Sequence, residues 1–362
     1  MGIYLSALLL SVCFSFLYNR GNGKDIRIHK GKLILNGSLL FGVLSFLPLT
    51  LVAGLRYDVG TDWSGTYLQI FNSIKNGSKI RDGGYGVLNQ FALLFTDSYA
   101  GIIFLSAALI GVFVYMAIFQ QSKIPAMSIL LFVFTGQYFF SLNGIRQALA
   151  TSIFIYAIKY IRQRDYKKYF FWILIAVSVH TMALLYIPLY FYKPVAKFYK
   201  QILFILFFGF IYSEQVSGLV QILLRKLRFL NRYFSWYFQS QYNSGRLSII
   251  SLTVQICVLL LMIYIYRSYC REDEESQLFL VMQILAVASL ILSAAVPLMQ
   301  RVSFLFSFGN IIYLPNYIKK IKNKKIVFGI STLILVCFFV YMWGTIVIRN
   351  YNEVLPYQSI FL

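Results

Sequence analysis

Charge is scarce in this sequence. Asp, Glu, Lys and Arg make up 12% of its 362 residues, whereas 59% are hydrophobic. The mean hydropathy is +0.70, which a soluble domain of this length does not reach. One apolar run follows another, so the sequence predicts an all-α polytopic integral membrane protein. We expect about 10–12 transmembrane helices, with re-entrant or amphipathic segments at the outer face.

Histidine and cysteine are also rare. The two histidines, His29 and His180, are too few for a His-rich metal site. The four cysteines are scattered, and no pair has the spacing of a metal site or of a disulfide framework. We therefore expect neither a metal nor a cofactor. The first apolar run, residues 3–18, lacks a basic n-region and a cleavage site, so we interpret it as a retained span.

Acidic residues are the scarcest charge: 12 Asp and Glu face 33 Lys and Arg, for a net charge of +21. The basic residues lie in short loops between apolar runs and not along one continuous stripe. This distribution argues against nucleic acid as a partner. Part of the excess is a topological signal, and part is available to anionic lipid head groups or phosphates.

Basic loops set the expected orientation. Residues 20–32, 162–168 and 319–325 are strongly basic, so we expect all three in the cytoplasm. Counted from the first loop, residues 55–98 form an extracytoplasmic loop with short helices, and the region around Asn143 also lies outside. Counted back from the last loop, the region around Arg301 lies outside.

The two counts disagree by one crossing near residues 200–218. Either that run does not span, or a second helix crosses between residues 219 and 238; we favour a non-spanning or re-entrant run. Residues 219–246 form an amphipathic, Arg-rich segment that we expect on the extracytoplasmic side. No soluble domain is inserted, so residues 1–362 form a single transmembrane domain.

The most informative segment, residues 55–63, joins the second apolar run to a polar loop. It combines Arg56, Asp58 and Asp62 with Tyr57 and Trp63 at the mouth of a span. Charge at that depth is costly and is usually functional, although Trp, Tyr and Arg also collect as membrane-surface anchors. We predict substrate contact for these side chains. For Asp62 the alternative is an N-cap of the helix that begins at Trp63.

Further polar residues are expected on the same outer face. Arginines suit a phosphate or diphosphate, because the planar guanidinium donates two parallel hydrogen bonds and stays charged. The alternative is a boundary anchor for Arg146 and Arg301, and a satisfied core residue for His180. Residues 83–86 are glycine-rich but lack the features of a phosphate loop, so we expect a flexible turn there. The candidates are Asn143, Arg146, Gln147, His180, Arg232, Arg246 and Arg301.

In their order along the chain, these segments resemble the EpsG-like branch of Wzy-type polysaccharide polymerases, which make capsule, exopolysaccharide or O-antigen. The resemblance covers about the first half of the chain; the second half matches loosely, through Arg301 and its aromatic neighbours. The matching segments are GLRYDVGTDW (residues 54–63) with Tyr67, NGIRQALA (143–150), and YKKYF (166–170) leading to His180.

The resemblance implies an enzyme of the bacterial cytoplasmic (inner) membrane. Such proteins resemble inverting, metal-independent glycosyltransferases that join undecaprenyl-diphosphate-linked oligosaccharide repeat units on the outer face. Catalytic roles then fall to Arg146, His180, Asp58 and Arg301. Substrate binding falls to the other candidates: Arg56, Tyr57, Asp62, Trp63, Asn143, Gln147, Arg232 and Arg246. Membrane lipid, a flippase and a chain-length regulator are the partners that this reaction implies.

Two alternatives remain. A flippase or other transporter of lipid-linked oligosaccharide would use the same arginines, although transporters usually show internal symmetry, which this sequence lacks. A membrane polysaccharide ligase or acyltransferase would place a histidine on an accessible face, which His180 alone does not exclude.

Overall fold

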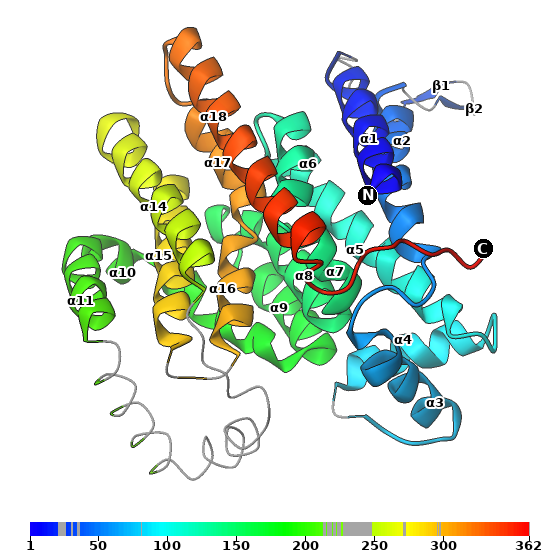
Figure 1. Ribbon diagram of the computed structural model, residues 1–362. Coiled ribbons are helices and arrows are strands. Elements are labelled where there is room, and N and C mark those ends of the chain that lie inside the picture. Colours follow the sequence, from blue (N-terminus) through cyan, green and yellow to red (C-terminus); the bar gives the residue numbers. More distant parts are fainter. Residues whose placement is uncertain are drawn as a thin grey trace. The chain divides into compact units, whose positions relative to one another are not determined.

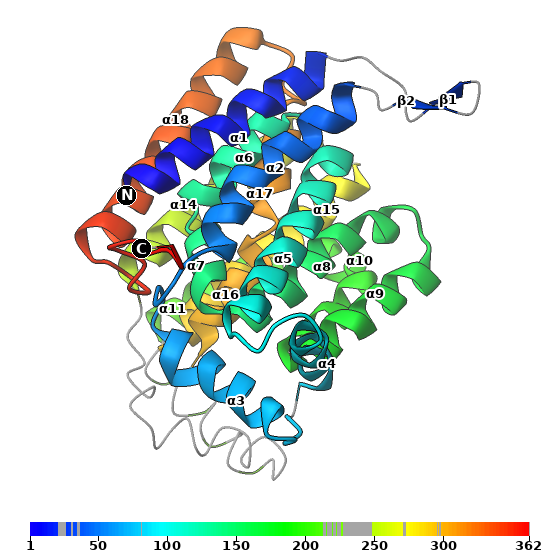
Figure 2. The same ribbon diagram turned by 90° about the vertical axis from the view of Figure 1, so that its right-hand side faces the viewer.

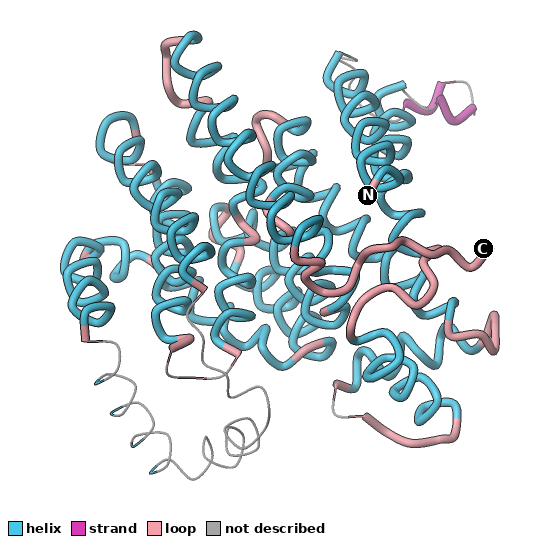
Figure 3. The backbone as a smooth tube through the Cα atoms, viewed as in Figure 1, coloured by secondary structure: helices cyan, strands magenta, loops and turns pink. Residues whose placement is uncertain are grey.

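The computed structural model describes residues 1–20, 27–29, 32–34, 37–80, 82–212, 248–270, 273–294, 296 and 298–361, together with positions 215, 219, 222 and 226. The expectation of an all-α polytopic membrane protein is confirmed (Figure 3). Apart from helices, the described part contains a short antiparallel pair, β1 (Arg27–His29) and β2 (Lys32–Ile34). The amphipathic segment expected at residues 219–246, with Arg232 and Arg246, lies outside the described residues except for the isolated positions.

The chain forms two compact units, which are described separately. Unit 1 comprises residues 1–187 and 322–362, and unit 2 comprises residues 188–321. The long helices of unit 1 are α1 (Gly2–Arg20), α2 (Gly37–Gly54), α5 (Ala100–Gln121), α8 (Ile145–Arg162), α9 (Tyr166–Val179) and α18 (Lys324–Met342). Its shorter elements are η1 (Trp63–Leu68), α3 (Gln69–Lys75), α4 (Gly83–Leu93), α6 (Pro125–Phe134), α7 (Gln137–Asn143), η4 (Trp343–Ile348) and the first part of η2 (Thr181–Phe191).

Over the residues it describes, the structure contains fewer full-length membrane-spanning helices than the sequence has apolar runs. In the described part, 4 helices are long and apolar enough to cross a membrane: α5, α18 extended through η4, and, in unit 2, α14 (Ile249–Tyr269) and α15 (Glu274–Leu292). The bent pair α6–α7, with an angle of 53°, makes up to 5. Its break falls at Gly136, whose φ of +83° is left-handed and suits glycine. Other apolar runs form shorter helices of 10–17 residues.

The two ends of unit 1 differ in character. At one end, Tyr18 and Phe119 are 4.3 Å apart between ring centroids, and Lys159 Nζ donates to Gln120 at 2.6 Å. The basic loops begin or end here, and Figure 2 shows β1 and β2 beyond the same ends of α1 and α2. At the other end, the Tyr4 hydroxyl donates to the Val354 carbonyl at 3.0 Å. The 54–63 and 143–150 segments lie at this second end, and its expected extracytoplasmic position remains a prediction.

A helical hairpin replaces the span expected at residues 169–192. The Tyr169 hydroxyl donates to the Tyr186 carbonyl at 2.6 Å, and Tyr186 stacks on Phe154 of α8 at 3.6 Å. A continuous helix would separate residues 169 and 186 by about 25 Å. η2 therefore turns back along α9, with His180 at the bend. Residues 200–218 contain a shorter apolar helix, Tyr199–Ile211, so the expected non-spanning or re-entrant course of that run remains a prediction.

The elements of unit 2 are α10 (Lys193–Lys197), α11 (Tyr199–Ile211), α14, α15, α16 (Met299–Ser307) and α17 (Asn310–Ile318). Of these, α14, α15 and the consecutive helices α16 and α17 lie side by side (Figure 1). α16 and α17 run back along α15: Asn310 donates to Gln283 at 3.0 Å, and Asn316 donates to Glu275 at 2.9 Å. Arg301 is therefore at the opposite end of α15 from Glu275.

Candidate functional site

The loop of residues 55–62 pairs with the C-terminal tail of the chain. The Tyr57 amide donates to the Gln358 carbonyl at 3.0 Å, and the Gly60 amide donates to the Glu353 carbonyl at 3.1 Å. Gly60 has a φ of +105°, and a Cβ there would lie 3.0 Å from the Leu142 carbonyl oxygen. Both its conformation and its close packing therefore require glycine. This tail contact could not be predicted, because it joins residues about 300 positions apart in the sequence. Tyr357 and Val52, whose contact is one example, are separated by 305 positions.

Asn143 holds this loop in place. Its Oδ1 accepts from the Thr61 hydroxyl at 2.9 Å and from the Asp62 amide at 2.7 Å. Its Nδ2 donates to Asn352 of the tail at 3.2 Å. These contacts give Asn143 a role in shaping the loop, and its substrate contact remains a prediction.

Arg56 is a buried clamp between helix ends. Its side chain donates to the Ala53 carbonyl of α2 and, at 2.9 Å, to the Leu142 carbonyl of α7. Both carbonyls are at helix C-termini, where partial negative charge favours a cation. The residue is only 2% exposed and forms no ion pair within the described residues. These contacts account for a buried arginine without a substrate, so diphosphate binding by Arg56 also remains a prediction.

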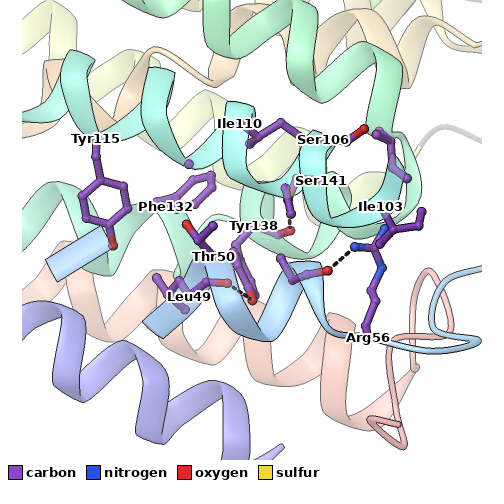
Figure 4. Close-up of a pocket in the computed structure, with 14 residues that line it drawn as sticks. Leu49, Thr50, Arg56, Ile103, Ser106, Ile110, Tyr115, Phe132, Tyr138 and Ser141 are labelled. Carbon is purple, nitrogen blue, oxygen red and sulfur yellow. Dashed lines mark hydrogen bonds between the residues drawn. The ribbon is translucent and has the colours of Figure 1, made fainter. Parts of the chain in front are cut away.

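The cavity beside Arg56 is small. Figure 4 shows Arg56 at one side of it, with Tyr138 and Ser141 along another. Its volume is about 20 Å³, enough for a water molecule and too little for a sugar ring. It is therefore not the substrate cavity.

A second cluster joins Asp82, Arg146 and His180. Arg146 Nη1 donates to Asp82 Oδ2 at 2.6 Å, and His180 Nδ1 lies 3.4 Å from the same oxygen. The Asp82 side chain is 5% exposed, whereas those of Arg146 and His180 are 25% and 20% exposed. The carboxylate is thus covered while both of its partners reach the surface. The long contact to His180 is one that substrate binding can tighten.

Two glycines bring these three side chains together. Gly144 separates α7 from α8, and a Cβ there would lie 2.6 Å from the Phe140 ring. Gly84 lets the first turn of α4 approach α9, since its Cβ would lie 2.3 Å from the Ser178 hydroxyl. The glycine-rich residues 83–86 are therefore not a flexible turn. They are the start of α4 and bring Asp82 next to His180.

The π-helix η1 touches both arginines. Trp63 lies under the Arg56 guanidinium at 5.6 Å, and Tyr67 lies under that of Arg146 at 5.9 Å. Tyr67 also accepts from the Arg146 amide at 3.4 Å. Burial raises the pKa of the Tyr67 phenol, and the nearby Arg146 charge offsets only part of that rise. Tyr67 is therefore a neutral, fixed support for Arg146.

The other candidates of the 55–63 segment lie nearer the surface. Tyr57 is 56% exposed, and Asp58 is exposed with a φ of 49°. Asp62 precedes η1 but its side chain makes no capping bond, so the N-cap alternative is wrong; its contact is a long one, 3.5 Å from the Thr66 hydroxyl. Gln147 is buried in α8, one residue beyond Arg146.

Arg301 belongs to the first turn of α16 in unit 2, where it is half-buried. The turn before it contains Leu298, whose φ of 66° is left-handed. Arg232 and Arg246 lie outside the described residues.

Sequence reasoning missed Asp82. It precedes a glycine pair in a polar loop and looks like an ordinary turn residue. The one available signal was scarcity: with 12 acidic residues in the whole chain, each acid between spans is a candidate.

Comparison with models of known protein families assigns the chain to one of them. Residues 39–359 match the EpsG family. The chain belongs to the EpsG family. This family comprises Wzy-like polysaccharide polymerases, so the resemblance noted from the first half of the sequence is confirmed and now extends over most of the chain. No curated protein and no solved structure matches the chain. The EpsG family assignment and the apolar helices together identify a multi-pass membrane protein of the polysaccharide polymerase type.

Proposed function

We propose that this EpsG family member joins undecaprenyl-diphosphate-linked oligosaccharide repeat units on the outer face of the bacterial inner membrane. The observation that carries the proposal is the Asp82–Arg146–His180 cluster. It joins a guanidinium suited to a diphosphate and an imidazole suited to proton transfer, through one covered carboxylate. It lies at the end of unit 1 that is remote from the basic loops, which is the end expected outside.

Arg146 is the residue proposed to bind the donor diphosphate. It sits in the first turn of α8, where the helix dipole already carries partial positive charge. Asp82 balances the charge of Arg146 and orients its guanidinium, while the Arg146 side chain remains 25% exposed. The guanidinium can therefore also donate to a diphosphate, whose negative charge grows as it leaves.

His180 is the residue proposed to take the proton. With Nδ1 held by Asp82, Nε2 is the nitrogen that remains as a base. The acceptor hydroxyl oxygen attacks the anomeric carbon of the donor. The bond from that carbon to the diphosphate oxygen breaks, and the diphosphate leaves with the electron pair. The hydroxyl proton goes to Nε2, and the anomeric configuration inverts because attack and departure occur on opposite faces. Preorganised positive charge on Arg146 stabilises the diphosphate as it leaves, so the proposal includes no metal.

The test is a reaction of the purified protein with a lipid-linked repeat unit. We expect a ladder of longer lipid-linked products, formed also in the presence of a chelator. His180→Ala is expected to lower turnover by about two to four orders of magnitude. Movement of the lipid-linked unit across vesicles without any ladder would contradict the proposal and favour a flippase. Loss of the ladder on chelation would contradict the metal-free step alone.

A further inference from the structure

A polar cavity lies at one end of unit 2. It has a volume of about 890 Å³, in the range of ligand sites. Its lining residues come from α10, the start of α11, the end of α14 and the start of α15. Its polar and aromatic lining residues are Lys193, Lys197, Lys200, Gln201, Arg267, Gln277, Tyr199 and Tyr266.

Positive charge in this cavity exceeds negative charge. Lys193 is paired with Glu274 at 2.8 Å. Among the residues that the structure describes, Lys197, Lys200 and Arg267 form no ion pair. The other described acids at this end have partners of their own: Asp273 pairs with Lys320, and Glu275 accepts from Asn316. An anionic ligand would balance these three cations.

An apolar surface adjoins the cavity. α11 begins with Tyr199 and Lys200 at the cavity wall and continues as an almost entirely apolar helix. None of its residues is buried within the described part, and Phe204, Ile205 and Phe207 are 65%, 66% and 60% exposed. A ligand that carries both an anionic group and long apolar chains fits this combination.

Contacts at this end of unit 2 indicate which leaflet of the membrane the cavity faces. The Asp273–Lys320 pair places the start of the basic 319–325 segment at the cavity end of unit 2. This end is therefore expected to face the cytoplasm, where anionic lipids attract Lys and Arg.

We propose that this cavity binds the phosphate head group of an anionic phospholipid of the cytoplasmic leaflet, with the acyl chains along α11. Lys197, Lys200 and Arg267 contact the phosphate, and the side-chain amides of Gln201 and Gln277 hydrogen-bond to the rest of the head group. Arginine and lysine are the natural donors to phosphate, and basic pockets between membrane helices recur as sites for anionic head groups. The site does not depend on the reaction proposed for unit 1.

The experiment is native mass spectrometry of the purified protein in detergent, titrated with phosphatidylglycerol or with phosphatidylcholine of the same acyl chains. We expect phosphatidylglycerol to be retained at about tenfold lower concentration than phosphatidylcholine, because only its head group carries net negative charge. Equal retention of the two lipids by the wild-type protein would overturn the proposal before any variant is made.

Matched variants locate the site. Lys197→Gln, Lys200→Gln and Arg267→Gln together should weaken phosphatidylglycerol retention by about tenfold or more. The control, Lys322→Gln, Lys324→Gln and Lys325→Gln together, removes the same charge from exposed positions of the basic loop and should leave retention unchanged. An equal loss in both triple variants would show charge attraction without a site and would overturn the proposal. The single variant Lys200→Gln repeats the test if the triple variant fails to fold, with an expected smaller loss in the same direction.

A competition distinguishes lipid from soluble phosphate. Inorganic phosphate at millimolar concentration should not displace bound phosphatidylglycerol, because the acyl chains on α11 also hold the lipid. Full displacement would overturn the lipid assignment in favour of a small soluble phosphate ligand.

Discussion

Two aspartates, Asp82 and Asp273, occupy the same kind of position and do different things. Each stands immediately before a helix, where an aspartate usually caps the first turn. Asp273 does so: it accepts from the Ser276 amide at 2.8 Å and pairs with Lys320. The side chain of Asp82 makes no capping bond and instead contacts Arg146 and His180. Without a capping hydrogen bond to Asp82, α4 lacks about 1 kcal/mol of stabilisation. The orientation of the Asp82 side chain therefore reflects another role.

Arg146→Lys tests the partner of Asp82 and should give the largest effect. Lysine keeps the charge but loses the planar fork, so we expect turnover to fall by about two to three orders of magnitude. The measurement is ladder formation per folded molecule from a defined lipid-linked unit. Near-normal turnover would mean that Arg146 is a boundary anchor, because an ammonium serves that purpose equally well.

Arg56→Lys is the matched comparison in the same unit. Its contacts are helix-end carbonyls, so we expect a loss of about 1–3 kcal/mol in stability and little change in turnover per folded molecule. Thermal unfolding in detergent and the ladder assay separate the two effects. A turnover loss as large as that of Arg146→Lys would instead support the sequence-based prediction that Arg56 binds diphosphate.

Gly84→Ala tests the packing that positions Asp82. The added methyl would meet Ser178 at 2.3 Å, and the backbone carbon of Ser178 at 2.8 Å. We expect about 1–3 kcal/mol of destabilisation and a drop in turnover, since α4 must shift away from α9. Gly83→Ala is the control, because a Cβ there meets nothing within 4 Å. Equal behaviour of the two variants would contradict this close packing.

Asp273→Ala should give the smallest effect and confine it to stability. Loss of the cap is expected to cost about 1 kcal/mol, with turnover unchanged.

The stability lost in Asp273→Ala should also depend on pH. Burial alone would raise the pKa of Asp273, but hydrogen bonds from Lys320 and Ser276 outweigh it and hold the pKa below its usual value. A depressed folded pKa stabilises the protein above the unfolded pKa of about 4 and loses that contribution as the pH falls through the folded pKa. The difference in melting temperature between wild type and Asp273→Ala should therefore shrink below about pH 4; a constant difference would contradict the ionic contribution.

Composition and the length of the apolar runs predicted the fold class, and the resemblance of segments such as 54–63 and 143–150 predicted the family. Both could be predicted because run length and short motifs are local features of the sequence. The hairpin at residues 169–192 was missed, because an apolar run of that length reads as a span and the turn at His180 depends on the contact between Tyr169 and Tyr186. Asp82 and the C-terminal tail were missed for the same reason: their roles come from contacts between distant parts of the chain. Among the predicted residues, Arg146 and His180 come together in one cluster, whereas Arg56 and Asn143 hold the surrounding loop.

The most direct test of the central claim compares Asp82→Asn with Asp273→Asn. Both substitutions remove one negative charge from the position before a helix and change the side-chain volume equally. Ladder formation per folded molecule from a lipid-linked repeat unit is the measurement. We predict a fall of about tenfold or more for Asp82→Asn, because Arg146 and His180 lose the group that orients them, and no loss for Asp273→Asn. Unchanged turnover in Asp82→Asn, or an equal loss in both variants, would contradict the assignment of this cluster as the catalytic site.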